Sequence, residues 1–420
     1  MQAVTEMSAQ PLPLSLPQTP CPLPKTLRYF WAGSAGLIAL TLIVAWVKYC
    51  AGVWWGLWIP LVDTRYSDLT MLLPVYRHLH STAFYSGQVP YPPLGAVTYA
   101  ALYATAHPVR VWMATAVIWL AVGVWCVRQQ MMRHNIRPAT ATLFPLTLVL
   151  LSFPIVGLVQ RCNIELYLWI FAATGTWATL RGRNNVAAVL WGLAAAMKLY
   201  PLILLGLLLP RRQWRAFVLG VTTFLAASAL SLCWLGPTMA AAWHGVMSGL
   251  FGYQDSRVSQ WTLHEIMPNH SAFGLAKVAM LMAGLPVSRL TLLYFVCGAT
   301  VMSVAFFARL WRMPVTNQLL AVSAFMLMFP PISYFYTLVN LYAPLLMLLS
   351  LAIRAEQAGA RVAGLRGTVL LFVPLFAPFT LFTYPDIYLY GGLVQAFLLV
   401  LLLTCALQYP FAIKEAEKIS

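Results

Sequence analysis

The sequence predicts an all-α fold, a polytopic bundle of membrane helices, and three observations support this prediction. Hydrophobic residues make up 61% of the 420 residues and charged residues only 9%, whereas roughly a quarter of the residues of soluble proteins are charged. Apolar runs of about 20 residues recur along the chain, and each is long enough to cross a bilayer. Arginine and lysine gather at the ends of these runs, as the positive-inside bias predicts. We therefore expect roughly 10–13 transmembrane helices, with interfacial helices in the outer loops.

The charge and cysteine patterns exclude two other classes of protein. The net charge of +16 does not indicate a nucleic-acid partner, because no basic stripe interleaved with aromatic residues occurs in any polar stretch. The seven cysteines are scattered singly, without a CxxC pair or metal-ligand spacing. We accordingly expect no nucleic-acid partner, no metal site and no cofactor.

The chain is predicted to form one membrane domain between two short tails. Residues 1–27 are rich in Pro, Gln, Ser and Thr, which predicts a disordered cytoplasmic tail. The apolar run from Tyr29 to Val47 is long for a signal-peptide core and lacks a small-residue cleavage site, so we expect an uncleaved anchor with its N-terminus inside. The membrane domain is expected over residues 28–410, and a cytoplasmic C-terminal tail over residues 411–420.

Further apolar segments follow the anchor, with basic clusters between them. Three segments separate Arg28 from Arg128, and three more separate Arg215 from Arg309. An even number is needed to place all four arginines on the same side. Either one segment of each group is re-entrant or interfacial, or one basic loop lies outside, and both alternatives stay open. The segments cover residues 91–106, 109–127, 139–157, 163–180, 185–209, 216–235, 272–286, 290–308, 316–332, 334–351, 368–383 and 389–408.

Two stretches rich in polar and aromatic residues, 48–90 and 243–271, are predicted to form the outer loops. The first holds Asp63 and Asp68, two of only ten acidic residues. A carboxylate beside a bilayer is costly, so one that is retained there is a functional candidate. We expect Asp63 to be solvated or paired with a nearby arginine, and Asp68 to carry a function.

The stretch from Gln160 to Glu165 enters an apolar segment and brings charge with it. Arg161 and Glu165 are four residues apart, so on one continuous helix they would share a face and could pair. One interpretation is that this pair and Asn163 satisfy one another within the bundle. The other is that these residues face a ligand, and the sequence does not decide between the two.

Lys198 lies in the middle of an otherwise uninterrupted apolar stretch. It has no carboxylate within helical reach, and Pro201 is expected to break the helix beside it. A lysine without a partner at a helix break suits a bound anion such as a phosphate. The alternative is a lysine that snorkels to the interface, and we favour the anion site.

Two more polar interruptions complete the set of candidates. Residues 268–275 place Asn269, His270 and Ser271 before an apolar run, where Asn and Ser are also ordinary helix N-caps. Residues 330–336 contain two prolines and end at Tyr336, and the alternative there is a kink with aromatic packing.

Together these segments resemble glycosyltransferase family 87, within the GT-C superfamily of membrane transferases that use lipid-phosphate sugars. Two departures from the family pattern stand out. Arg161-Cys162 replaces a frequent Gly-Gln pair, and Tyr336 stands where many members carry a histidine. The resemblance rests on Asp68-Leu69, Tyr91-Pro92-Pro93-Leu94, Arg161 to Glu165, Gly192 to Pro201, Arg211-Arg212 and Asn269-His270-Ser271.

The resemblance implies a GT-C-like hexosyltransferase that takes a hexose, most simply mannose, from a polyprenyl-phosphate donor to a lipid or glycan acceptor with inversion. It places the protein in a bacterial inner membrane as a multi-pass protein, with its active site on the non-cytoplasmic side. Asp68 would be the general base, and Lys198 with Arg161 would bind the donor phosphate. The rival function is a transporter or flippase of a lipid-linked sugar, although no inverted repeat of broken helices is evident. Further substrate contacts are expected from Asn163, Glu165, Tyr91, Asn269, His270, Ser271 and Tyr336.

Overall fold

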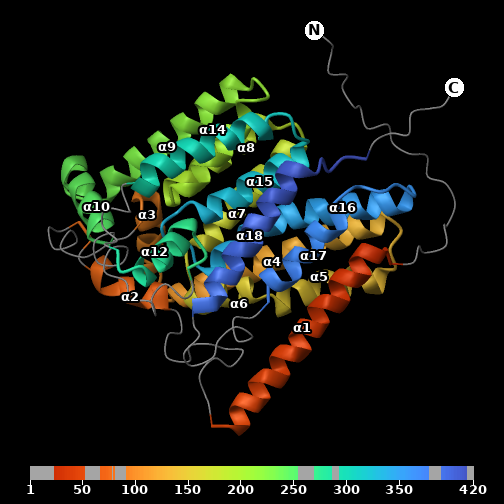
Figure 1. Ribbon diagram of the computed structural model, residues 1–420. Coiled ribbons are helices and arrows are strands. Elements are labelled where there is room, and N and C mark those ends of the chain that lie inside the picture. The colour runs from red at the N-terminus through yellow and green to blue at the C-terminus, as the bar shows by residue number, and fades with distance from the viewer. Residues whose placement is uncertain are drawn as a thin grey trace.

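The computed structural model describes residues 23–52, 67–77, 79–80, 91–253, 269–285, 293–377 and 389–413. Within these ranges the regular structure is helical, and β-structure is limited to isolated bridge residues, among them the pair Asn269 and Tyr334. The predicted all-α fold is therefore confirmed (Figure 1). Asp63 and residues 1–22 and 414–420 lie outside the described ranges, so the predictions made for them are not addressed by the structure.

The helices follow the predicted apolar segments closely, because these segments are bounded by prolines, glycines and basic turns. Two helices, α2 and α10, arise inside the predicted outer stretches. In chain order the elements are α1 (Lys25–Cys50), α2 (Ser67–Tyr76), α3 (Pro93–Tyr103), α4 (Pro108–Arg133), α5 (Pro138–Leu151), α6 (Phe153–Arg161), α7 (Glu165–Leu180), α8 (Asn184–Met197), η3 (Tyr200–Leu208), α9 (Trp214–Leu235), α10 (Met239–Tyr253), α12 (Ala272–Met282), η5 (Tyr294–Gly298), α14 (Ala299–Leu310), α15 (Val315–Met328), η6 (Phe335–Leu341), α16 (Tyr342–Gln357), α17 (Leu365–Leu375) and α18 (Leu389–Gln408).

The structure corrects the predicted limits in three places. Helix α1 begins at Lys25, inside the stretch that we expected to be a disordered tail. The predicted segment 139–157 is two helices, α5 and α6, divided at Ser152, which has extended backbone angles. At the other end of the chain Phe411 is buried, and its amide donates to Asn317 Oδ1 at 2.7 Å, so the tail cannot begin at residue 411.

Breaks within the helices reduce the number of spans that length alone can identify. In the described ranges, five helices are long and apolar enough to cross a bilayer, or six if the bent pair α5 and α6 is one span. Four shorter apolar helices accompany them: α8, α12, α15 and α17. This count falls below the 10–13 transmembrane helices expected, because proline and 3-10 breaks divide several of the apolar segments.

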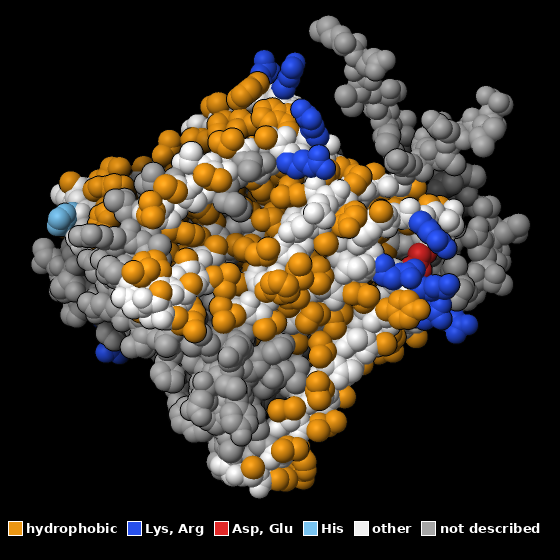
Figure 2. Space-filling view, in the orientation of Figure 1, with side chains coloured by type: hydrophobic (Ala, Val, Ile, Leu, Met, Phe, Trp, Pro, Cys, Tyr) orange, Lys and Arg blue, Asp and Glu red, His pale blue; other side chains and the backbone are white. Residues whose placement is uncertain are grey.

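Most basic clusters meet at one end of the bundle, which we call the basic end. Gln357 Nε2 donates to the carbonyl of His134 at 2.7 Å, joining the C-terminal ends of α16 and α4. Arg309 Nε donates to the carbonyl of Leu407 at 3.0 Å, joining those of α14 and α18. Helix α17 packs against both α16 and α18, and Figure 2 shows the Lys and Arg side chains along the upper and right-hand edges. The basic end carries Lys25, Arg28, Arg128, Arg133, Arg137, Arg181, Arg183, Arg211, Arg212, Arg215, Arg309, Arg312, Arg354, Arg361 and Arg366.

Two short helices explain how these clusters share one end. Helices α3 and α12 have 11 residues each, or about 16 Å of length, whereas the hydrocarbon core is about 30 Å thick. Both lie at the end opposite the basic end, together with α2 (Figure 1). Among the described residues, only α1 and α4 between Arg28 and Arg128, and only α9 between Arg215 and Arg309, are long and apolar enough to cross a bilayer. The lengths of α3 and α12 are consistent with the alternative in which one segment of each group does not cross.

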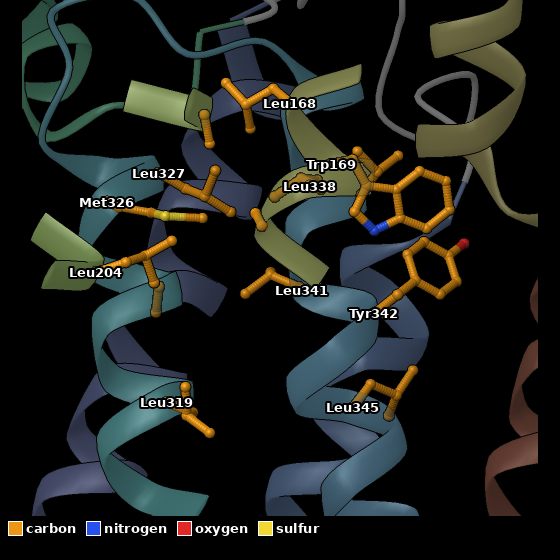
Figure 3. Packing of buried hydrophobic residues seen from close by; sticks show 14 of the residues in the cluster. Leu168, Trp169, Leu204, Leu319, Met326, Leu327, Leu338, Leu341, Tyr342 and Leu345 are labelled. Carbon is orange, nitrogen blue, oxygen red and sulfur yellow. The ribbon is translucent and has the colours of Figure 1, made fainter. Parts of the chain in front are cut away.

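In the bundle interior, leucine side chains pack between the helices, and some helix backbones lie in direct contact. Buried side chains from α7, η3, α15, η6 and α16 interdigitate around Leu327 and Leu341 (Figure 3). Helices α8 and α9 touch at glycines, since a Cβ built on Gly192 would lie 2.5 Å from the carbonyl oxygen of Gly220. Small residues at such contacts allow membrane helices to pack without a hydrophobic driving force.

We predict that the two ends of the bundle lie on opposite sides of the membrane, with the basic end in the cytoplasm. Cysteine can be introduced for Arg183 at the basic end and for Met239 at the opposite end, in a chain whose native cysteines are replaced. Both native side chains are exposed. An impermeant maleimide should label position 239 in intact cells, and position 183 only after permeabilisation. Equal labelling of both positions in intact cells would contradict the topology, and the cysteine-free chain is the control.

Candidate functional site

The candidate site forms where several helices break, at the end of the bundle opposite the basic end. Helix α6 ends at Cys162, whose left-handed conformation (φ 49°, ψ 44°) turns the chain before α7 begins. Helix α8 ends at Lys198, which is extended (φ −147°, ψ 140°) and precedes the 3-10 helix η3. Proline at position 201 therefore accompanies a break, as predicted. Such breaks free polar groups at membrane depth and are tolerated where the surrounding protein satisfies them.

Asp68 lies in the first turn of α2 and is held from two sides. Asn163 Nδ2 donates to Asp68 Oδ2 at 2.6 Å, and Arg161 Nη1 donates to Oδ1 at 3.3 Å. The Asp68 side chain is 14% exposed. The carboxylate is thus oriented by a guanidinium and an amide and still reaches the surface of the site.

Asn163 is the centre of the site and is completely buried. Besides Asp68, its Nδ2 lies 3.3 Å from the hydroxyl of Tyr91 and 3.4 Å from that of Tyr336. Its Oδ1 accepts from Lys198 Nζ at 3.2 Å and from the Glu165 backbone amide at 2.8 Å. One amide side chain therefore links an acid on α2 to a base at the end of α8.

The prediction that Lys198 has no acidic partner is wrong. Lys198 Nζ forms a 2.7 Å ion pair with Oε2 of Glu165, and the Glu165 side chain is fully buried. Oε1 of Glu165 accepts from Asn340 Nδ2 at 2.6 Å and from the hydroxyl of Tyr200. The carboxylate comes from α7 and not from the helix of the lysine, so helical spacing could not reveal it.

The pair between Arg161 and Glu165, which was one of the two interpretations left open by the sequence, is absent. The left-handed turn at Cys162 separates α6 from α7, so the two residues do not share a helical face. Arg161 pairs with Asp68 instead, and Glu165 pairs with Lys198. Two acids and two bases thus form a set of opposite charges that balance, which is the condition for keeping charge in an apolar bundle.

Tyrosine rings surround both cations. The Arg161 guanidinium lies 5.2 Å from the Tyr334 ring centroid and 5.6 Å from that of Tyr336. Lys198 Nζ lies 5.5 Å from the Tyr336 centroid and 5.8 Å from that of Tyr91. These distances fall within the range of cation–π attraction. Tyr336, which stands where the resemblance leads us to expect a histidine, therefore lies between the two cations.

Each cation retains a hydrogen-bond donor for a ligand. Within the described ranges Arg161 Nε is buried and has no hydrogen-bond partner, and a buried donor without a partner is costly. The ammonium of Lys198 has three N–H donors, and its two oxygen partners are Asn163 and Glu165. An oxygen-rich anion bound between these side chains would satisfy both.

A close approach of two backbones brings Tyr91 to Lys198. Pro92 and Pro93 begin α3, where proline is well tolerated in the first turn. A Cβ built on Gly95 would lie 2.6 Å from the carbonyl oxygen of Met197. Only glycine allows α3 to pack this tightly against the end of α8, and this packing sets the position of Tyr91 over the lysine.

Asn269, His270 and Ser271 hold a neighbouring segment in place. Ser271 caps α12 by accepting from the Gly274 amide at 2.9 Å, as the N-cap interpretation predicted. Asn269 Oδ1 accepts from the Ser333 amide at 2.9 Å. His270 Nε2 lies 3.0 Å from the Ser333 hydroxyl. These contacts position the segment that carries Tyr334 and Tyr336, and substrate binding by these three residues stays a prediction.

Four partners of the site were not among the residues selected from the sequence. Tyr200 and Asn340 bind Glu165, Trp112 Nε1 donates to the Asn163 carbonyl at 3.1 Å, and the Tyr99 hydroxyl accepts from the Ile164 amide at 3.3 Å. The available signal was a single amide, Asn340, in an apolar run. Tyrosine and tryptophan are too frequent in this chain to mark a site. In the described part of the chain, no three His, Cys, Asp or Glu side chains group as metal ligands would.

Comparison with known proteins identifies one family. The model of glycosyltransferase family 87 matches residues 90–333, which is more than half of the chain. The match contains Tyr91, the turn from Arg161 to Glu165, and Lys198, whereas Asp68 precedes it. No curated protein and no solved structure matches the chain.

His270 should make the folded protein sensitive to acid. Complete burial lowers the pKa of His270 from its usual 6.5 to about 3. As the pH falls through 6.5 the unfolded chain binds a proton that the folded chain does not. The free energy of unfolding should therefore fall by about 2 kcal/mol between pH 7 and pH 5. Thermal unfolding in detergent at both pH values measures this change.

To assign this pH dependence to His270, the stability of His270→Gln is compared with that of His107→Gln. His107 is exposed, so its variant is the control. The His270 variant should be less stable at pH 7 and should lose less stability at pH 5, whereas the His107 variant should follow the wild type. An unchanged pH dependence in His270→Gln would show that this histidine is not the source.

Proposed function

The chain belongs to glycosyltransferase family 87, and from this membership we propose that it transfers a hexose, with mannose as the proposed sugar, from a polyprenyl-phosphate donor. The acceptor would be a lipid- or envelope-linked glycan. The observation that carries the proposal is the placement of one carboxylate, Asp68, and two cations, Arg161 and Lys198, around the amide of Asn163. A transferase using a phosphate leaving group needs a base and a source of positive charge within one site.

Asp68 is the proposed general base. The acceptor hydroxyl must lose its proton as its oxygen attacks the anomeric carbon, and a carboxylate within hydrogen-bond reach accepts that proton. The hydrogen bonds from Arg161 and Asn163 fix the orientation of this carboxylate. The bond between the anomeric carbon and the phosphate oxygen breaks in the same step. A single displacement of this kind inverts the configuration of the sugar.

Arg161 and Lys198 are proposed to bind the donor phosphate. Negative charge grows on the phosphate oxygen as the sugar leaves, and fixed cations in a site of low dielectric stabilise that charge. The unpartnered Nε of Arg161 and the third N–H of Lys198 are the donors available for this contact. Tyr91 and Tyr336 lie beside the same cations and would line the sugar or phosphate subsite.

The proposed location is a bacterial inner membrane, with the site on the non-cytoplasmic side. Support comes from the separation between the site and the basic end, because basic loops favour the cytoplasm. A lipid-linked donor presented at the outer leaflet could then reach the site directly. Membership in a transferase family favours sugar transfer over the alternative of a lipid-sugar flippase.

Asp68→Asn should lower the rate of sugar transfer by about 10²- to 10⁴-fold, because the amide cannot accept the hydroxyl proton. Donor binding should change much less, since the phosphate contacts are made by other residues. Transfer is measured with a radiolabelled polyprenyl-phosphate mannose, and donor binding by titration in nanodiscs. Normal turnover in the variant would refute the role of the base, and a loss of binding equal to the loss of turnover would assign Asp68 to the donor site.

Lys198→Met should weaken donor binding by about 10- to 100-fold, because a desolvated phosphate loses a charged hydrogen-bond donor. The same change leaves the buried carboxylate of Glu165 without its counter-charge. A loss of binding must therefore be distinguished from misfolding of the variant. The double variant Lys198→Met/Glu165→Gln removes both charges, and we expect it to fold and still bind donor weakly. Donor affinity of the double variant equal to that of the wild type would remove Lys198 from the phosphate site.

A further inference from the structure

A long groove opens on the flank of the bundle; it runs from the basic end to Trp169, one helical turn from Glu165, and its lining does not include the residues of the candidate site. Its walls are α4, α5, α7 and α16, and its volume is about 1220 Å³, larger than the roughly 300–1,000 Å³ of a small-molecule site. From Trp119 to Arg133 it follows α4 for about 21 Å. The walls are mainly apolar, and Trp125 and Trp177 on the rim are 59% and 51% exposed.

Three arginines lie at the basic end of the groove. Arg133 is the last residue of α4, Arg181 follows α7, and Arg354 is in the last turn of α16. Arg181 lies over the ring of Trp177, 5.3 Å from its centroid, so it is held at the rim. All three are exposed.

None of these arginines has an acidic partner in the described part of the chain. Only Glu356 supplies a carboxylate at this end within those ranges, and it is occupied elsewhere. It accepts from the hydroxyl and amide of Thr26 and pairs with Arg366 at 3.8 Å. Three exposed positive charges without an acidic partner in the described ranges therefore lie at the mouth of an apolar groove.

We propose that this groove binds an anionic phospholipid of the leaflet at the basic end. Its phosphate would lie among Arg133, Arg181 and Arg354, and its acyl chains would lie along α4 and α7. Arginine recognises phosphate oxygens through paired N–H donors, and anionic headgroups are attracted to basic residues at the membrane surface. The charge at one end and the apolar walls beyond it match the two parts of such a lipid.

A polyprenyl donor is the less favoured occupant of the groove. Its phosphate must reach Lys198 and Arg161, which lie at the opposite end of the bundle from the three arginines. A donor in the groove would leave these arginines without a counter-charge. A bound phospholipid would instead join α4, α7 and α16 at the basic end, where Gln357 already links α16 to His134.

The test is a titration of the purified full-length protein with phosphatidylglycerol or phosphatidylcholine in detergent, with bound lipid counted by native mass spectrometry. We expect the wild type to retain one phosphatidylglycerol per chain and to bind phosphatidylcholine at least about tenfold more weakly. Replacing Arg133, Arg181 and Arg354 together by Gln should weaken phosphatidylglycerol binding by about tenfold or more. The matched control replaces Arg183, Arg215 and Arg312 by Gln, which removes the same charge from the same end outside the groove.

A second pair of variants tests the apolar part without altering charge. Gly123 lines the groove, and a Cβ there meets nothing within 4 Å, so Gly123→Phe fills space that the lipid would occupy. Gly36→Phe is its control, because Gly36 on α1 is equally unobstructed and lies outside the groove. The first should weaken phosphatidylglycerol binding and the second should not.

Four results would overturn the proposal. The first is equal phosphatidylglycerol affinity in the two arginine triples, and the second is equal affinity of the wild type for the two phospholipids. The third is displacement of bound phosphatidylglycerol by a polyprenyl phosphate, which would assign the groove to the donor chain. A dimer that dissociates in Gly123→Phe would likewise assign the groove to a second copy of this chain. None of these measurements depends on sugar transfer, so they are independent of the proposed activity.

Discussion

The arrangement of the candidate site depends on one buried amide, that of Asn163. Its nitrogen donates to Asp68 and its oxygen accepts from Lys198, at 2.6 and 3.2 Å. An amide is suited to this place because it offers a donor to an acid and an acceptor to a base at the same time. An aspartate at position 163 could not donate a hydrogen bond to Asp68. A hydrophobic residue of similar size there would leave Asp68 and Lys198 without this hydrogen-bond partner. In an environment of low dielectric, each such loss is costly.

The breaks after α6 and α8 also depend on hydrogen bonds supplied by the surrounding bundle. Each break exposes backbone groups that a bilayer cannot satisfy, so the surrounding bundle must supply their partners. The amide of Ile164, beyond the first break, donates to Tyr99, and the carbonyl of Asn163 accepts from Trp112. The breaks in turn deliver Arg161 and Lys198 to the site. Four charges that would each be unfavourable alone become tolerable as two crossed pairs, Asp68 with Arg161 and Glu165 with Lys198.

The molecule is polarised along its length. One end carries arginine clusters, and among the described residues its only acid is Glu356. The other end carries a network of acids, bases and tyrosines in which the charges of Asp68 and Glu165 balance those of Arg161 and Lys198. The first pattern suits the surface of a membrane, where isolated basic side chains are solvated or meet anionic headgroups. The second suits chemistry on a charged substrate in a dry site. The flanking groove between α4, α5, α7 and α16 runs from the first end to Trp169, one helical turn from Glu165 of the second.

The sequence by itself determined the fold class, most helix positions and the residues that could carry charge in the site. Hydropathy, proline and basic turns are local signals, so α7, α9 and α18 lie where the pattern predicts them. Arg161, Asn163 and Lys198 were recognisable because polar residues are rare in or beside apolar runs, and Asp68 because it is one of only ten acidic residues. Only the tertiary structure decided which acid pairs with which base. Those partners come from different helices and across a left-handed turn at Cys162, and helical spacing holds no information about contacts between helices. For the same reason the shared position of the short helices α3 and α12, at the end opposite the basic end, became evident only from the bundle.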